Sequence, residues 1–122
     1  MPTYVDGYLL PVPTRNLEKY RAMAARAAKI WKKHGALSYC EAAAEDMSAK
    51  FCPPFTKLLK PKRGETLIFA FVTYKSRAHR DKVNAAVMAD PELMAGCDPK
   101  NMPFDCTRMF YGGFSAIVEA RQ

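Results

Sequence analysis

The order of apolar and polar residues along the chain predicts four strands and two long helices. Aromatic and β-branched residues cluster between turn residues at four places, which is typical of strands: 4–12, 37–43, 67–74 and 108–118. Apolar residues recur at spacings of three and four in two further segments, which is typical of helices: about 17–34 and 77–90. Strands and helices therefore alternate along most of the chain.

Residues that cap or end helices support these boundaries. Thr14 or Asn16 is expected to cap the first helix and Ser76 the second, since their side chains can accept bonds from free backbone N–H groups. Gly35 and Pro91 follow the helices and should end them.

Two segments lack a clear period. Residues 45–64 contain three prolines, and within them 55–60 is expected to form a short lysine-rich strand of the kind that protects a sheet edge. Residues 91–106 are irregular, with a helical turn expected at 92–95.

The predicted element order is β-α-β-(β)-β-α-β over a single domain, residues 1–122. It indicates an α+β protein: a ferredoxin-like βαββαβ fold with a short inserted strand and two helices on one face of an antiparallel sheet. The opposite sheet face then has no helix to cover it.

The strand at 67–74 shows how the two sheet faces differ. Period-two alternation places Ile68, Ala70 and Val72 on one side, where their small side chains suit a covering helix. Phe69 and Phe71 then project from the helix-free side. Because soluble monomers avoid large apolar patches, we expect a second copy of the chain to cover this face.

Composition and charge exclude several classes of protein. No apolar run approaches the roughly 18 residues of a membrane span, and the N-terminus resembles no signal peptide, so the expected location is cytoplasmic with no membrane partner. Four cysteines and two histidines show none of the short spacings of a metal site, so we expect reduced thiols and no metal. The sequence contains no nucleotide or haem signature, so we expect no cofactor.

A net charge of +7 and the stretch FAFVTY at 69–74 raise the question of RNA binding. The stretch fits the end of the RNA-recognition consensus, but Leu67 and Ile68 stand where that consensus has a basic residue and a glycine. The phosphate contact is missing, so the sequence disfavours nucleic acid as a partner.

Three residues are candidate catalytic groups: Asp6, Tyr39 and His79. If Gly7 lets a helix approach the first strand, Asp6 and Tyr8 face the helix-free side together with Phe69 and Phe71. A desolvated Asp6 could then act as a base, with Tyr39 or His79 as its proton partner. The alternative, which we favour, is a structural hydrogen-bonded carboxylate.

Candidate ligand contacts are the aromatic and acidic strand residues Tyr8, Glu41, Phe69, Phe71 and Tyr111.

A second candidate site is an anion site at the start of the second long helix, where free N–H groups and basic side chains coincide: Ser76, Arg77 and Arg80. The alternative there is a solvated helix end on which Asp81 pairs with Arg77.

Several motifs together resemble a known family: YVDGY at 4–8, PVP at 11–13, YRAMA at 20–24, HGAL at 34–37, VNAAVMADP at 83–91, MPFD at 102–105 and YGGF at 111–114. The chain is identified on these motifs as a member of the YbaA-like family of small bacterial proteins of unassigned function, in the dimeric α/β-barrel superfamily. The resemblance implies a ferredoxin-like subunit whose sheet pairs face to face with that of a second copy, forming a dimeric α/β barrel. It implies no established activity.

Three functional hypotheses follow. The first is a homodimeric barrel that binds a small aromatic or apolar ligand in its interior. The second is a cofactor-independent enzyme of the oxygenase or isomerase type, which rests on analogy with similar barrels. The third is RNA binding through a basic surface.

Overall fold

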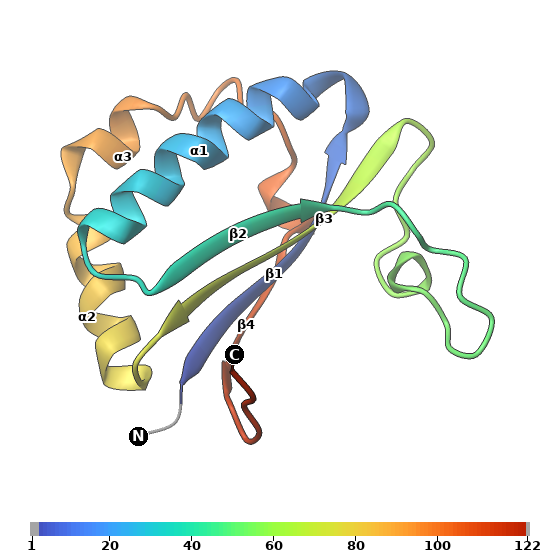
Figure 1. Ribbon diagram of the computed structural model, residues 1–122. Helices are drawn as coiled ribbons and strands as arrows, with labels where there is room; N and C mark the ends of the chain where they lie inside the picture. The colour runs from blue at the N-terminus through green and yellow to red at the C-terminus, as the bar shows by residue number, and fades with distance from the viewer. Residues whose placement is uncertain (1–2, 122) are drawn as a thin grey trace.

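The computed structural model describes residues 3–121, which fold into one four-stranded sheet with helices packed on one face (Figure 1). In chain order the elements are β1 (Tyr4–Pro13), the 3₁₀ helix η1 (Thr14–Asn16), α1 (Leu17–Lys33), β2 (Ser38–Ala43), η2 (Phe55–Lys57), β3 (Glu65–Tyr74), α2 (Arg77–Met88), α3 (Pro91–Ala95), η3 (Cys106–Arg108) and β4 (Phe110–Ser115). All strand pairs are antiparallel, in the order β2-β3-β1-β4. The predicted α+β class is confirmed, and the sheet of one chain is open and is not a closed barrel.

The core lies between the helices and the sheet. One group of buried residues gathers where α2 crosses the sheet: Tyr4, Ile30, Ala36, Val72, Tyr74, Val83 and Val87. A second group lies beneath the first half of α1: Leu10, Val12, Tyr20, Ala24 and Ile68. The predicted faces of the third strand are confirmed, since Ile68, Ala70 and Val72 are buried whereas Phe69 is 47% exposed.

Glycine ends α1 as the sequence predicts. Gly35 has a φ of +110°, a conformation that few other residues tolerate. The next N–H group, of Ala36, donates to the carbonyl of Trp31 at 3.0 Å, and that of Gly35 donates to Lys32 at 3.1 Å. This double closure satisfies the last carbonyls of the helix and turns the chain into β2.

The predicted helix caps have different outcomes. Ser76 caps α2, because its Oγ accepts from the backbone N–H of His79 at 3.1 Å. Neither Thr14 nor Asn16 caps α1: residues 14–16 form η1, and no side-chain cap bond is made at Asn16. The Asn16 amide instead donates to the carbonyl of Pro103 at 3.1 Å, tying the start of α1 to a distant loop.

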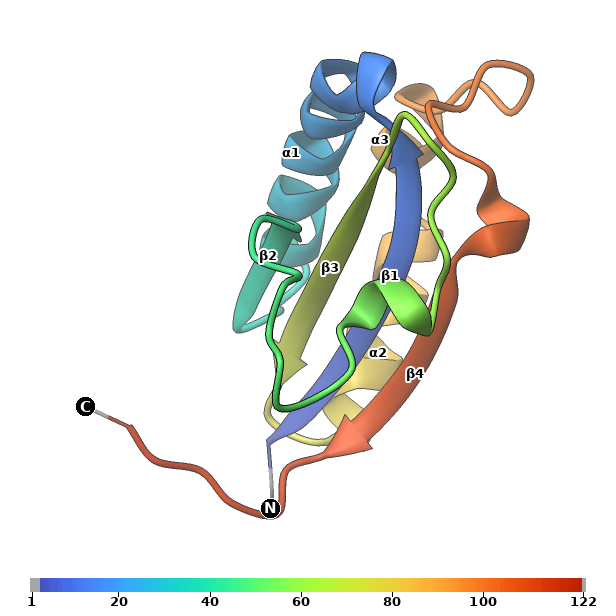
Figure 2. The same ribbon diagram turned by 90° about the vertical axis from the view of Figure 1, so that its right-hand side faces the viewer.

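The strand expected at 55–60 is wrong. This segment forms the 3₁₀ turn η2, in which Lys57 and Leu58 donate backbone bonds to Pro54 and Phe55. Pro53 and Pro54 precede it and have no N–H groups to give to a sheet ladder, so the chain turns rather than pairs. The segment between β2 and β3 lies over the helix-free face of the sheet (Figure 2).

The last strand is shorter than its apolar run at 108–118. Residues 106–108 form η3, and β4 ends at Ser115, which pairs with Tyr4 at the start of β1. Beyond that pair β4 has no neighbouring strand, so Ile117 and Val118 leave the sheet and stand in solvent.

The expectation that Asp6 and Tyr8 share a face with Phe69 and Phe71 is also wrong. Gly7 pairs with Phe71 and Leu9 with Phe69, and directly paired residues point to the same side of a sheet. Asp6 and Tyr8 therefore point toward the helices.

Gly7 on β1 and Gly112 on β4 are directly paired in the sheet. The ring of Phe114 lies over both: a Cβ would stand 3.5 Å from it at Gly7 and 3.3 Å from it at Gly112. The glycines thus make room for an aromatic ring on the helix-free face, and no helix approaches there.

Candidate functional site

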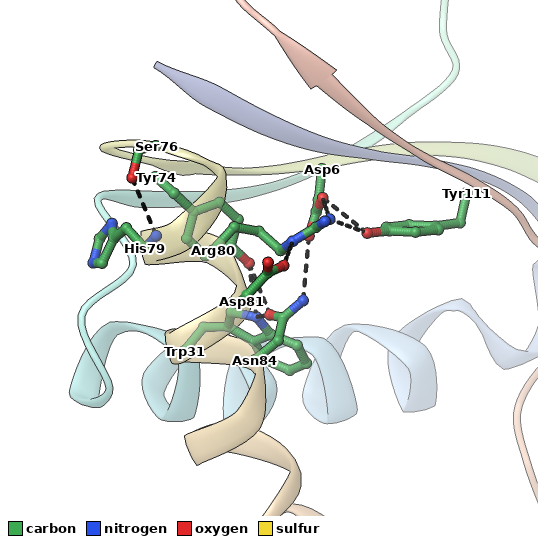
Figure 3. A network of polar contacts seen from close by, with 9 residues as sticks. All are labelled: Asp6, Trp31, Tyr74, Ser76, His79, Arg80, Asp81, Asn84 and Tyr111. Carbon is green, nitrogen blue, oxygen red and sulfur yellow. Dashed lines mark hydrogen bonds and ion pairs between the residues drawn. The ribbon is translucent and has the colours of Figure 1, made fainter. Parts of the chain in front are cut away.

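Asp6 is the centre of a polar network beneath α2 (Figure 3). Its side chain is fully buried. Arg80 Nη1 donates to Asp6 Oδ1 at 2.7 Å, the Tyr111 hydroxyl donates to the same oxygen at 2.9 Å, and Asn84 Nδ2 lies 3.4 Å from Oδ2. A buried carboxylate needs such partners, since an unpaired buried charge is costly.

Arg80 extends this network outward. Its Nη1 lies 2.6 Å from the Tyr111 hydroxyl, its Nε donates to Asp81 at 2.7 Å, and its guanidinium stands 4.9 Å from the centre of the Tyr4 ring. Burial and the bond to Asp6 raise the pKa of Tyr111 to about 12. Asp81 pairs with Arg80, and not with Arg77 as the sequence suggested.

The network reaches α1 through Trp31. The indole Nε1 lies 3.1 Å from the Tyr74 hydroxyl and 3.2 Å from Asn84 Oδ1, and the Tyr74 hydroxyl donates to the same Asn84 oxygen at 3.1 Å. Three residues from three elements, Trp31, Tyr74 and Asn84, thereby support Asp6 from the side of α1. The whole arrangement holds β1, β3, β4, α1 and α2 together.

The other predicted partners of Asp6 lie elsewhere. His79 points away from Asp6, and its Nδ1 accepts from the backbone N–H of Lys75 at 2.9 Å (Figure 3). The structure likewise does not bring together an anion site, because Ser76 Oγ is used by His79 and Arg80 is engaged by Asp6 and Asp81. Arg77 is exposed.

A cavity of about 290 Å³ opens on the same side of the sheet, between α1, α3 and the strands. Its walls are apolar and aromatic, contributed by every layer of the fold: Tyr8, Leu10, Tyr20, Met23, Ala24, Ala27, Ile30, Trp31, Tyr39, Ala70, Val72, Met88, Leu93, Cys97, Phe104 and Met109. Three charged residues also line it: Arg26, Glu41 and Glu92. Ala24 and Ala27 present only methyl groups to the sheet here, which leaves this space open.

Glu41 on β2 is held at the cavity wall by two tyrosines. The Tyr20 hydroxyl donates to its Oε1, and the Tyr39 hydroxyl donates to its Oε2 at 2.7 Å. Burial, together with the nearby carboxylate, raises the pKa of both phenols well above the usual range. Both tyrosines therefore stay protonated and act as donors.

Tyr8 lines the cavity beside this group. Burial, with the charge of Asp6, raises the pKa of its phenol above the usual range. Within residues 3–121 its hydroxyl makes no hydrogen bond, and no deeply buried side-chain polar atom there is left unpaired. The Tyr8 hydroxyl is thus an open donor or acceptor.

The five predicted ligand contacts are divided among three places: the cavity, the Asp6 network and the helix-free face. Tyr8 and Glu41 line the cavity, and so does Tyr39, which was a catalytic candidate. Tyr111 belongs to the Asp6 network, and Phe69 and Phe71 lie on the helix-free face. Sequence reasoning missed Tyr20 and Phe104, whose rings meet edge to face at 5.5 Å; the PF dipeptide at 103–104 offered no helical or strand period to place it.

The helix-free face carries a second, shallower hollow of about 280 Å³. Apolar residues of the sheet and of the segment around η2 line it, chiefly Leu9, Phe55, Leu58, Phe69, Phe110 and Phe114. Phe55 and Phe69 stack with ring centres 6.2 Å apart. This hollow has aromatic walls and no charged side chain.

Among residues 3–121, no three His, Cys, Asp or Glu side chains gather closely enough to hold a metal ion. No helix within the same range has the length and apolar character to span a bilayer.

Comparison with known proteins agrees on one family. The family described as "Protein of unknown function (DUF1428)" matches residues 3–106. The uncharacterized protein YbaA of Escherichia coli strain K12 is 37% identical over 116 residues, covering 95% of this chain and 97% of that protein, and YbaA of Shigella flexneri matches equally well.

A solved structure, the de novo designed protein Foldit4, covers 96% of this chain with 11% identity and a TM-score of 0.45. That likeness is too weak to support an argument about fold or function. The family match and the YbaA relatives each cover most of the chain. On this evidence the chain belongs to the DUF1428 family of YbaA-like proteins of unknown function.

Proposed function

We propose that this protein binds a small, mainly apolar molecule in the cavity between α1, α3 and the sheet. One observation carries the proposal: an aromatic-walled space of about 290 Å³ that holds a single hydrogen-bonded carboxylate group, Glu41 with Tyr20 and Tyr39. Ligand sites are typically apolar hollows of about 300–1,000 Å³ with a few placed polar groups. The volume suits a ligand at the small end of that range.

Packing physics supports the same conclusion. Protein interiors contain few voids larger than a water molecule, because each missing contact costs stability. Larger side chains at Ala24 or Ala27 would fill this space from α1. Keeping alanine there is consistent with a space that a ligand uses.

Trp31 offers a direct test, because it is the only tryptophan and its ring lines the cavity. A small aromatic probe, 2-phenylethanol or 2-phenylethylammonium, should change its fluorescence in a saturable way. Ala27→Leu fills the cavity and should weaken probe binding about tenfold or more. Ala22→Leu makes the same change on the exposed side of α1 and should leave binding unchanged.

Saturable binding that Ala27→Leu and Ala22→Leu affect equally would place the probe outside the cavity. Absence of any saturable fluorescence change for both probes would contradict the proposal.

We propose in addition that two copies pair through their helix-free faces. The strand order β2-β3-β1-β4 with the helices on one face supports a ferredoxin-like subunit. Phe69, Phe110 and Phe114 are 47%, 60% and 62% exposed on that face, and such a patch marks an interaction surface. Face-to-face pairing of two open sheets would produce the dimeric barrel.

Sedimentation velocity at micromolar concentration tests this pairing. Native protein should sediment as a dimer, and Phe110→Glu should sediment as a monomer, because it would bury a charge in the interface. Lys29→Glu changes an exposed residue of α1, on the opposite side of the sheet, and should remain dimeric. A monomeric native protein would contradict the pairing; in that case, salt-sensitive binding of single-stranded RNA at low ionic strength would show that the aromatic face contacts bases.

A further inference from the structure

The carboxylate at the cavity wall has no positive partner. Within residues 3–121, no Lys, Arg or His nitrogen lies within 4.0 Å of Glu41. Building on the proposed function, we propose that the ligand itself supplies the charge: an organic cation, in which an ammonium nitrogen joined to a flat apolar body is held by Glu41 and the surrounding aromatic rings.

The bonding capacity of Glu41 is only half used. An ionised carboxylate offers about four acceptor positions. Tyr20 takes one on Oε1 and Tyr39 takes one on Oε2. These two donors fix the orientation of the carboxylate, and they leave further acceptor positions for the N–H groups or the charge of a ligand.

The walls next to Glu41 suit a cation as well. Aromatic faces attract ammonium groups within about 6 Å of the ring centre, and several rings together form the cages that hold quaternary ammonium ligands. Trp31 and Tyr39 lie with ring centres 5.9 Å apart and are tilted by 50°. Tyr8 and Tyr20 complete the aromatic wall, and their phenol oxygens are neutral donors and acceptors.

The remaining charges along the cavity do not supply a partner. Arg26 and Glu92 also line it, and these opposite charges offset one another. The guanidinium of Arg26 lies against the backbone of Gly96, after α3, where a side chain at that glycine would collide with it. Glu92 stands 4.0 Å from Lys33 and is largely exposed. Of the two carboxylates that line the cavity, Glu41 is thus the one set among aromatic rings.

Glu41 also lines a shallow groove between α1 and β2, beside Arg21 and Ala28. Glu41 is half-buried and keeps access to water from this groove, and the penalty for burying a charge falls where water can reach it. The cavity therefore presents a negative charge to its occupant without the full cost of a buried ion.

Two soluble probes of nearly equal shape separate charge from hydrophobic fit: 2-phenylethylammonium and 2-phenylethanol. Both carry a phenyl ring and a hydrogen-bond donor, and only the first is charged near neutral pH. Titration against Trp31 fluorescence should show the cation binding about tenfold more tightly than the alcohol, the scale of one good cation–π or charged contact.

Substitution assigns the preference to a residue. Glu41→Gln keeps the shape and removes the charge, and it should bring the two dissociation constants within about twofold of each other. Glu119→Gln makes the same charge change in the exposed C-terminal segment, where Glu119 pairs with Arg121, and should keep the tenfold preference. Far-ultraviolet circular dichroism of each variant checks that the fold is intact.

The comparison of probes on the native protein needs no variant and tests by itself whether charge selects the ligand. If the alcohol binds as tightly as the cation, the ligand is not selected by charge and the inference is wrong, whereas the cavity remains a binding site. If the preference persists in Glu41→Gln, another group selects the charge and the assignment to Glu41 is wrong. If neither probe binds, the proposed function fails first.

Discussion

Two carboxylates face the helices from neighbouring parts of the sheet, Asp6 on β1 and Glu41 on β2, and each accepts a hydrogen bond from tyrosine. Asp6 also has a guanidinium at 2.7 Å and no exposed surface. Glu41 has no cationic side chain of residues 3–121 within 4.0 Å and opens on a cavity. The same chemical group is thus completed by the protein in one place and left incomplete in the other.

This difference helps to distinguish a carboxylate that stabilises the fold from one that can bind a ligand. A buried charge whose partners are all supplied stabilises one arrangement of the chain. A charge whose partners are only half supplied, next to an open space, can recognise a molecule from outside. The candidate base Asp6 belongs to the first kind, and the residue that we assign to ligand recognition belongs to the second.

The largest effect is expected at Asp6. Asp6→Asn should lower the free energy of unfolding by about 3 kcal/mol, because it leaves Arg80 without its buried partner. Urea denaturation followed by Trp31 fluorescence measures this loss. Asp81→Asn removes the exposed partner of the same arginine and should cost under about 1 kcal/mol. Equal losses for the two variants would mean that the buried pair has no special weight.

Filling the cavity should raise the free energy of unfolding, the opposite of the effect expected at Asp6. Ala27→Leu is expected to raise the free energy of unfolding by about 0.5–1 kcal/mol, since the added side chain gains contacts in existing space. Ala22→Leu on the exposed side of α1 should change it by less than about 0.5 kcal/mol. A clear loss of stability in Ala27→Leu would show that the space is too small for the three added carbon atoms, and would weaken the ligand proposal.

Glu41→Gln should have a small effect on folding. The glutamine keeps one carbonyl acceptor for a tyrosine, and the lost charge has no cation to leave behind, so the expected loss is under about 1 kcal/mol. The same urea titration measures it. A loss of unfolding free energy as large as that of Asp6→Asn would contradict the distinction between the two carboxylates, because Glu41 would then be a structural group too.

The smallest expected effect is the loss of stability that Asp90 causes at low pH. Three groups donate hydrogen bonds to the Asp90 carboxylate: the His34 ring, the backbone N–H of Glu92 and the Lys33 ammonium. They lower the pKa of Asp90 to about 2. An aspartate in an unfolded chain titrates near 4. The unfolded state therefore binds the extra proton first as pH falls, so the stabilisation from Asp90 is complete above about pH 4 and is lost between about pH 4 and 2.

Asp90→Asn should flatten the pH dependence of urea stability in that window. Asp98→Asn, in the exposed loop after α3, is the matched control and should retain the slope. An unchanged slope in Asp90→Asn would assign the acid sensitivity to other carboxylates whose pKa is lowered by hydrogen bonds, such as Glu65 and Asp105.

Much of the fold could be predicted because its signals are local. Ser76 and Gly35 mark helix ends by their own backbone preferences, and the alternation in β3 identifies the face that the helices cover. The strand expected at 55–60 failed because two prolines outweighed the lysine-rich pattern that follows them.

The faces of β1 could not be predicted in the same way. Asp6 and Tyr8 are no more apolar than Val5, Gly7 and Leu9, so alternation alone does not show which set is buried. The answer depends on Arg80, which is 74 residues from Asp6 in the chain and meets it only after folding. The cavity was missed for a similar reason: Tyr20, Glu41 and Phe104 come from three separate segments.

The ring of Phe114 rests on bare backbone, over Gly7 and Gly112, so it adds little height to the sheet surface. A methyl group at Gly112 would stand 3.3 Å from the ring and press it outward, whereas one at Gly7 would meet it at an ordinary contact distance of 3.5 Å. If two copies pair through this face as proposed, variation at Gly112 would alter the fit between them while each chain still folded, so differences between relatives in self-association should be sought there first.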